Sequence, residues 1–278
     1  MRKLCFLIII CFSFKQCSSL YYYPSKNLYY SPDIFGFKYE SHMIDGFEGT
    51  KLNVWRIYSP NVKNPKGVVL QFHGNGENMS SHFLSLAWLV NHGYELITYD
   101  YRGYGKSEGE SEPEEIFEDS KFVLDFALKH TKNINSKLIV YGQSLGGAVA
   151  MRSIADWPKA NQIQLICVDG SFTSYREVVK QTLNQNVFWP MGNIVSVFFH
   201  DATSPRDYIQ SLPPIPIVII HGTEDSVVFF KNGQEIFKLA NEPKVFLEIR
   251  GGGHVDWMGL GQSKFAKDFL KLLDRHLY

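Results

Sequence analysis

The chain has little of what marks several large classes of protein. Its 278 residues carry 28 Lys and Arg against 28 Asp and Glu, so no net charge of either sign attracts nucleic acid or an acidic membrane surface. The sequence has no internal repeat, no low-complexity tract and no long block of like charge. We therefore expect no nucleic-acid partner, and the hydrophobic content of 45% is that of an ordinary globular protein.

Cysteine is scarce, and its placement excludes a disulfide framework. Cys5, Cys11 and Cys17 lie close to the N-terminus, which leaves Cys167 alone in the body of the chain. No intrachain disulfide is then available to the folded domain in any compartment. Cys167 lies in the apolar run 165–168, and we interpret it as a buried hydrophobic residue and not as a nucleophile.

The apolar run at the N-terminus is too short to cross a bilayer. It extends over 11 residues, Leu4 to Phe14, after the positive Met1-Arg2-Lys3, whereas a spanning helix needs about 17–25 residues. This pattern is typical of a signal peptide, so we expect residues 1–17 to be a leader and the protein to be exported: periplasmic, secreted or membrane-anchored. An uncleaved anchor is the alternative interpretation of the same run.

Cys17 follows the apolar run and resembles the lipidated cysteine of bacterial lipoproteins. The preceding Phe14-Lys15-Gln16 departs from the usual pattern, in which an aliphatic residue is followed by small ones. Lipidation of Cys17, and with it membrane attachment through the N-terminus, therefore stays open.

From residue 67 onward, solid apolar runs alternate with helical segments. The expected strands are 68–72, 96–99, 138–141, 165–168, 217–220 and 245–249. The expected helices cover about 80–92, 113–131, 145–156, 230–241 and 257–276. Continuous apolar strands separated by helices predict an α/β fold with a mainly parallel central sheet and helices on both of its faces.

Two earlier segments predict an antiparallel edge to this sheet. Residues 37–40 and 52–58 are separated by a turn at Asp45-Gly46, and the second segment alternates like a half-buried strand near a sheet edge. No Pro/Gly/Ser-rich linker interrupts the series, so we expect one domain over residues 37–278, preceded by an N-terminal extension over residues 18–36.

One irregular region, about 170–214, is rich in aromatic residues and interrupted by prolines. It falls between the expected strands 165–168 and 217–220. It is interpreted as a packed crossover or as a lid, because long insertions are often functional.

A G-x-S-x-G pentapeptide, Gly142-Gln143-Ser144-Leu145-Gly146, is the most informative motif of the chain. It follows the expected strand 138–141 and precedes the small, helix-forming residues 147–152. Strand, tight turn and helix are the context in which this motif forms a nucleophile elbow. A Gly/Ser-rich turn without chemistry is the alternative when the pentapeptide is taken by itself.

A serine needs a base to remove its proton, and the base must be oriented by a carboxylate. Asp225 follows the expected strand 217–220 and is preferred as this carboxylate over the neighbouring Glu224. Among nine histidines, His254 follows the last expected strand in a glycine-rich loop, at the same sheet edge. We predict Ser144 as nucleophile, His254 as base and Asp225 as orienting acid.

The anionic tetrahedral intermediate of such a reaction needs two hydrogen-bond donors. We predict the backbone N–H of Leu145, directly after the nucleophile, and that of Asn75, in the loop after the strand 68–72. No histidine and carboxylate cluster has the spacing of a metal site, so neither a metal nor another cofactor is expected.

Taken together, these motifs resemble those of the α/β-hydrolase superfamily, and more narrowly those of bacterial exported serine hydrolases of the serine-aminopeptidase-like and esterase-like branches. The matching segments are 73–78 (HGNGEN), 99–109 (YDYRGYGKSEG), 142–147 (GQSLGG), 221–225 (HGTED) and 252–254 (GGH). The resemblance implies the α/β-hydrolase fold and the catalytic order serine, acid, histidine.

The resemblance does not choose a substrate, because one fold hosts many chemistries. We expect hydrolysis of a carboxylic ester or thioester on a small-molecule or lipid-like acyl substrate. The alternatives are an aminopeptidase-type amide hydrolase and a non-catalytic binding protein with the same fold. No acidic pair in 170–214 suits an α-amino group, and this observation favours the ester or thioester.

Overall fold

The computed structural model describes residues 22–186, 192–193, 196, 201, 203–258 and 264–277. The expected leader with Cys17 lies outside these residues, so its interpretation stays a prediction. Within the described residues, none of the helices combines the length and the apolar character needed to cross a bilayer.

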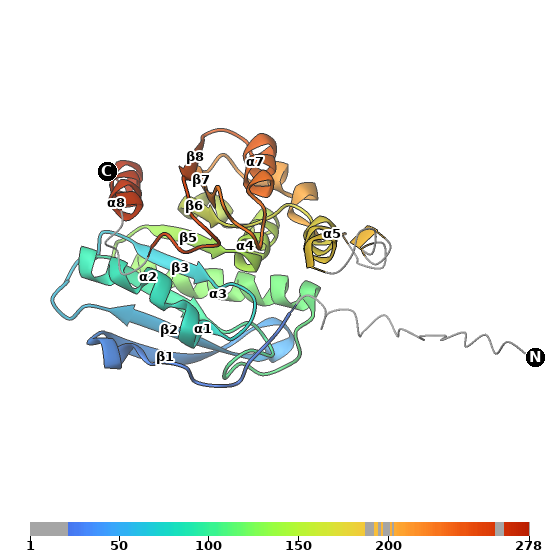
Figure 1. Cartoon of the computed structure of the whole chain (residues 1–278). Helices are drawn as coiled ribbons and strands as arrows, with labels where there is room; N and C mark the ends of the chain where they lie inside the picture. The colour runs from blue at the N-terminus through green and yellow to red at the C-terminus, as the bar shows by residue number, and fades with distance from the viewer. Residues whose placement is uncertain are drawn as a thin grey trace, which may run out of the picture.

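A twisted sheet of eight strands forms the centre of the described part of the chain (Figure 1). Its strands are β1 Lys38–Asp45, β2 Lys51–Tyr58, β3 Val68–Phe72, β4 Glu95–Tyr99, β5 Leu138–Gln143, β6 Ile163–Asp169, β7 Ile217–Gly222 and β8 Lys244–Ile249. Their spatial order is β1-β2-β4-β3-β5-β6-β7-β8. The pairs β1–β2 and β2–β4 are antiparallel and the remaining pairs are parallel. The predicted mainly parallel sheet with an antiparallel edge is confirmed.

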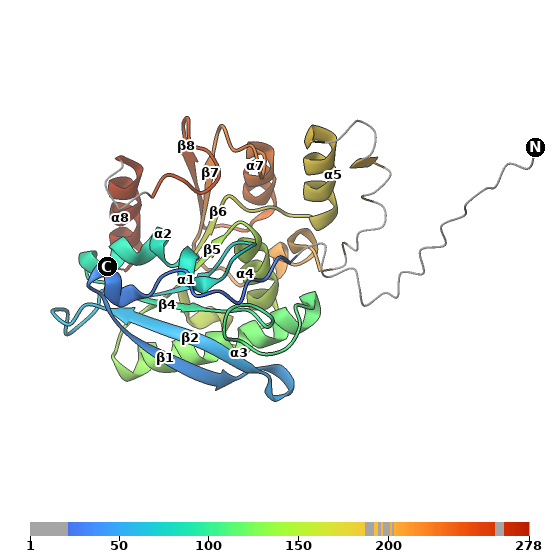
Figure 2. The same cartoon turned by 60° about the horizontal axis from the view of Figure 1, so that its bottom comes forward.

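Helices cover both faces of the sheet (Figure 2). They are α1 Met79–His82, α2 Leu84–Ala87, α3 Pro113–Asn133, α4 Leu145–Ala155, α5 Tyr175–Asn186, α7 Phe230–Leu239 and α8 Lys264–Leu277. Helices α3, α4 and α7 pack on one face, and α1, α2 and α8 pack on the other. Successive residues of a strand therefore enter different cores, as Val69 and Leu70 of β3 do. This arrangement explains why the central strands are apolar without alternation.

Three predictions need correction. The helix expected over 80–92 is divided into α1, α2 and a 3₁₀ turn at Trp88–His92. The helix expected from residue 257 begins at Lys264, since Trp257 and Met258 lie in a turn, where both are buried against the sheet. The segment expected to be a half-buried strand is β2, whose residues 52–55 are all buried because β2 lies between β1 and β4.

The region 170–214 contains a helix, α5, that the sequence pattern did not predict. It also contains two 3₁₀ turns, Pro205–Asp207 and Ile209–Ser211, and Ile209 is buried in the core with Phe172 and Tyr175. The described parts of this region therefore pack on the domain. Residues 187–191 and 197–200, with most of the remaining aromatic residues, lie outside the described residues, so the lid stays a prediction.

Cys167 provides a test of the packing. It is fully buried in β6, and burial, together with nearby Asp169, raises the pKa of its thiol. A protonated, buried thiol does not react with alkylating reagents. We expect iodoacetamide at pH 8 to leave Cys167 unmodified in the native protein and to modify it fully in concentrated urea, as checked by mass mapping of its peptide. Stoichiometric modification of Cys167 in the native protein would contradict this packing.

Candidate active site

The predicted nucleophile, acid and histidine follow three strands of the parallel part of the sheet. Ser144 follows β5, Asp225 follows β7 and His254 follows β8. Because β5 to β8 are parallel, their carboxyl ends meet at one edge of the sheet, where ligands bind in open α/β folds. Ser144 and His254 line the same cavity at this edge.

Ser144 lies in a strained turn between β5 and α4. Its backbone has φ 53° and ψ −118°, a conformation that residues with a side chain rarely adopt. The backbone N–H of Ser144 donates to the carbonyl oxygen of Asp169, at an N···O distance of 2.8 Å. A Cβ atom at Gly146 would lie 2.1 Å from the carbonyl oxygen of Phe72, so glycine is required where α4 crosses the end of β3. The pentapeptide thus has the geometry of a nucleophile elbow.

His254 and Asp225 are hydrogen-bonded to each other. The distance from His254 Nδ1 to Asp225 Oδ2 is 2.7 Å, and the Asp225 side chain is completely buried. The other carboxylate oxygen accepts the backbone N–H groups of Val227 (2.9 Å) and Val228 (2.8 Å). Glu224, the competing acid, is exposed and makes no such contact with the imidazole.

The surroundings of Asp225 determine which nitrogen of His254 carries the proton. Burial acts to raise the pKa of Asp225, but hydrogen bonds from His221, His254 and the backbone of Val228 outweigh it and hold this pKa well below its usual range. The carboxylate can therefore only accept a hydrogen bond, so Nδ1 of His254 is the donor. The lone pair of Nε2 is then available to accept a proton.

A second buried carboxylate, Asp169, lies beneath the histidine loop, and the sequence reasoning missed it. Asp169 Oδ2 accepts hydrogen bonds from the hydroxyl of Tyr141 (2.7 Å) and from the indole N–H of Trp257 (3.0 Å). The next residue is Gly170, where a Cβ atom would lie 3.3 Å from the His254 ring. An acidic residue at the carboxyl end of a strand in an otherwise apolar run was the signal that could have found it. Asp169 supports the backbone of the elbow and the side chain of Trp257, three residues after His254.

The two predicted oxyanion donors belong to the elbow itself and to the loop after β3. Leu145 is the first residue of α4, and Asn75 lines the cavity together with Ser144. The side-chain oxygen of Asn75 accepts three hydrogen bonds, from the backbone N–H of Tyr23 (2.9 Å) and Gly76 (2.8 Å) and from the hydroxyl of Tyr104 (3.0 Å). The oxyanion roles of the N–H groups of Asn75 and Leu145 stay predictions.

The cavity at this edge has a volume of about 400 Å³ and two unlike walls. Its lining residues are Gly74, Asn75, Ser81, His82, Ser85, Gln143, Ser144, Val227, His254 and Val255. Helices α1 and α2 contribute the polar side chains at positions 81, 82 and 85, and the acid and histidine loops contribute the two valines. Burial lowers the pKa of His82, so this imidazole is a neutral part of the wall.

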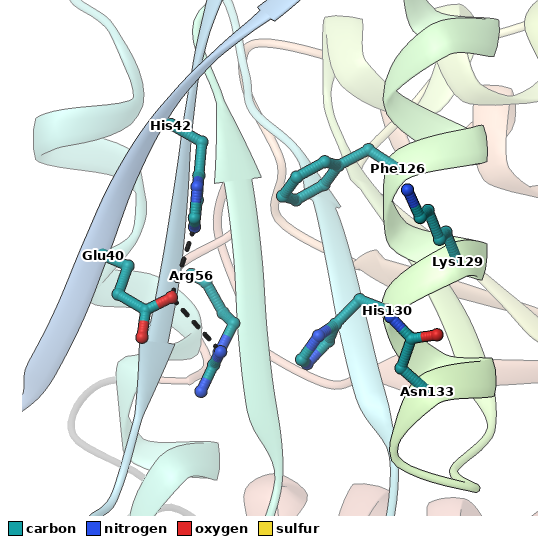
Figure 3. A pocket seen from close by; sticks show the side chains of 7 residues that line it. All are labelled: Glu40, His42, Arg56, Phe126, Lys129, His130 and Asn133. Carbon is teal, nitrogen blue, oxygen red and sulfur yellow. Dashed lines mark hydrogen bonds and ion pairs between the residues drawn. The ribbon is translucent and has the colours of Figure 1, made fainter.

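Another cavity, of about 210 Å³, lies between β1, β2 and the C-terminal half of α3 (Figure 3). Glu40 joins two of the lining side chains: its Oε2 lies 3.2 Å from Arg56 Nη1 and 3.3 Å from His42 Nε2 (Figure 3). It is lined by no serine or cysteine, so it offers no hydroxyl or thiol nucleophile. Within the described residues, no group of three or more His, Cys, Asp or Glu side chains could hold a metal ion.

Comparison with known proteins places this geometry in a family. The family model described as serine aminopeptidase, S33, matches residues 63–196, which include Ser144. The Salmonella typhi protein YfhR is 30% identical over 264 residues, which cover 90% of this chain and 86% of the relative. The chain belongs to the α/β-hydrolase superfamily.

Solved structures share the fold of this hydrolase. The Pyrococcus furiosus esterase Pf2001 matches with a TM-score of 0.74 and 19% identity, over 91% of this chain and 97% of the other. A soluble variant of monoglyceride lipase from Saccharomyces cerevisiae matches with a TM-score of 0.65 and 18% identity, over 91% and 98% of the two chains. At these identities the likeness shows the fold alone.

The buried Asp169 makes the stability of the hydrolase depend on pH. Burial raises the pKa of Asp169 from 3.8 to about 6 in spite of its two hydrogen bonds. Between about pH 4 and pH 6 the folded state therefore holds a proton that the unfolded state has lost, so stability falls as the pH rises through this window. Relative to Asp169→Asn, the free energy of unfolding of the wild type should fall by up to about 3 kcal/mol across it.

Urea titrations of both proteins at several pH values from 4 to 8 measure this difference. The free energy of unfolding of the wild type minus that of Asp169→Asn should decline up to about pH 6 and stay level above pH 7. A difference that does not change with pH would contradict the assignment.

Proposed function

We propose that this α/β-hydrolase cleaves a carboxylic ester or thioester through an acyl-enzyme on Ser144. The observation that carries the proposal is the 2.7 Å hydrogen bond between His254 and the buried Asp225. His254 lines the same cavity as Ser144. The strained elbow supports it, since strain of this kind persists where the surrounding structure enforces it, and it clusters at active sites.

In the proposed reaction, Ser144 Oγ attacks the carbonyl carbon while Nε2 of His254 takes the hydroxyl proton. Asp225 stabilises the imidazolium and keeps its ring oriented. The N–H groups of Asn75 and Leu145 donate to the oxyanion. The imidazolium then protonates the leaving alcohol or thiol, and a water molecule, activated by the same nitrogen, releases the acid from Ser144.

The cavity favours a small acyl ester over a long one. A volume of about 400 Å³ is at the low end of the range for ligand pockets, roughly 300–1,000 Å³. Its polar wall on α1 and α2 matches a substrate with hydrogen-bonding groups, and its two valines match a short apolar chain.

The family model favours a second candidate, an aminopeptidase-type amide hydrolase, because its description names that activity. Such an enzyme must bind the positive α-amino group of its substrate. Among the described residues that line the cavity there is no Asp or Glu to do so, and this observation supports the ester or thioester over the amide.

Hydrolysis of p-nitrophenyl esters from acetate to palmitate tests the proposal. We expect the highest kcat/KM for short acyl chains and a loss on the order of 10⁴–10⁶-fold in kcat for Ser144→Ala. Asp225→Asn should lower kcat by about 10⁴-fold with little change in KM, because it removes the acceptor that fixes the imidazole tautomer.

Glu224→Gln is the matched control, and it should retain activity since Glu224 is exposed. Ester hydrolysis retained in purified Ser144→Ala would refute the nucleophile. If the folded wild type hydrolyses none of the esters, the proposed substrate class is refuted. Hydrolysis of aminoacyl-anilides would then distinguish an amidase from a binding protein.

We also propose that the protein is exported, on the basis of the basic and apolar leader. A full-length chain should be recovered outside the cytosol, and a chain without residues 1–17 should remain inside. Mass spectrometry of the N-terminus tests processing, and a lipid-modified Cys17 would be recognised by its mass. Recovery from the cytosol of a full-length chain that retains Met1 would refute export.

A further inference from the structure

The residues that follow the leader lie along the predicted oxyanion loop. Residues 22–29, here called the N-terminal strap, are extended and run beside α1 (Figure 2). Tyr22 is 1% exposed and belongs to the core, so it anchors one end of the strap. The side chain of Tyr23 is 60% exposed, and Tyr23 contributes its backbone N–H.

Five hydrogen bonds join the strap to residues 75–80. They are Tyr23 N to Asn75 Oδ1 (2.9 Å), Ser25 N to the Glu77 carbonyl (3.0 Å), Asn78 Nδ2 to the carbonyls of Ser25 (2.9 Å) and Asn27 (2.7 Å), and Tyr29 N to Ser80 Oγ (3.0 Å). Through them, the strap contacts four of the six residues of the segment that carries the predicted oxyanion donor.

This loop needs external support. Gly76 and Glu77 both have positive φ, of 75° and 49°, and for Glu77 this conformation is unfavourable. Strained backbone of this kind persists when its surroundings determine it. The surroundings here include Ser25 of the strap, whose N–H donates to the Glu77 carbonyl, and His82 of α1, whose Nε2 lies 3.3 Å from the Gly76 carbonyl oxygen.

Asn75 links the strap to the predicted oxyanion site. Two of the three donors to its side-chain oxygen come from outside the loop: the N–H of Tyr23 and the hydroxyl of Tyr104. The strap also holds the segment that carries Tyr104, because the N–H of Gly105 donates to the carbonyl of Ser25 (2.9 Å). The backbone N–H of Asn75 lies two bonds from the Cβ atom of the side chain that these donors fix.

We propose that the N-terminal strap is a positioning element of the active site, which holds the side chain of Asn75 through Tyr23 and Tyr104 and thereby aims the N–H of Asn75 at the oxyanion. The proposal rests on the proposed function. It makes Tyr23 and Tyr104 positioning residues, whose loss affects the transition state more than substrate binding.

Tyr23 offers a matched pair of variants. Tyr23→Pro removes the backbone donor, and residue 23 already precedes Pro24, which favours an extended backbone at this position. Tyr23→Ala keeps the donor and removes the same exposed side chain. Tyr104→Phe removes the second donor without changing the packing of the ring.

The readouts are kcat and KM on a short p-nitrophenyl ester and the affinity for a trifluoromethyl ketone, which forms an oxyanion on the serine. Removal of an entire oxyanion donor costs about 10²–10³-fold, so its misplacement should cost about 10-fold in kcat in Tyr23→Pro and in Tyr104→Phe, and more in the double variant. KM should stay within about twofold, and ketone affinity should fall in parallel with kcat. Tyr23→Ala should lose less activity than Tyr23→Pro, because it keeps the backbone donor.

Three outcomes separate the interpretations. Melting temperatures show whether Tyr23→Pro and Tyr104→Phe are folded. If both are folded and keep wild-type kcat and ketone affinity, the proposal is overturned. It is also overturned if Tyr23→Ala loses as much activity as Tyr23→Pro, because the backbone donor would then not be the cause. A wild type that is inactive on esters and does not bind the ketone would refute the proposed function itself.

Discussion

The parallel pairing of β5 with β6, β7 and β8 is the constraint on which the active site depends. In this register Gln143 faces Asp169, Asp169 faces Ile220 and Ile220 faces Leu247. The residues that follow these positions therefore emerge at one edge of the sheet, where neighbouring strands lie about 4.8 Å apart. The elbow, the acid loop and the histidine loop therefore begin at the same edge of the sheet. The hydrogen bonds of the sheet hold the strand ends from which these three segments start.

Two carboxylates near this edge show how nearby hydrogen-bond donors shift the pKa of a buried acid. Asp225 receives an imidazole and two backbone N–H groups, and its pKa is held below the usual range. Asp169 receives one hydroxyl and one indole N–H, and burial raises its pKa to about 6. The carboxylate that receives more hydrogen bonds contacts the histidine, and the one that receives fewer supports the backbone near it.

The sequence was informative wherever local pattern and tertiary structure agree. The apolar runs predicted all six parallel strands, and the pentapeptide predicted the turn at Ser144 because only glycine fits beside α4. The antiparallel pairing of β2 near the edge of the sheet was predicted correctly, but its half-burial was not, because β2 is covered by neighbours on both sides, β1 and β4. The strap acts through contacts between segments more than 50 residues apart, and no local pattern encodes such contacts. Asp169 did leave a local signal, an acidic residue at the carboxyl end of an apolar strand, but its contact with Trp257 spans 88 residues.

The order of the strands along the chain also affects how the protein is made. Ser144 and its elbow are complete when half of the chain has been synthesised, whereas His254 arrives with β8, which pairs with β7 alone. During synthesis on the ribosome the proposed nucleophile is thus present for more than 100 residues without its proposed base. Under the proposed mechanism, a nascent or prematurely terminated chain carries an unactivated serine, and hydrolytic competence appears only after β8 has joined the sheet.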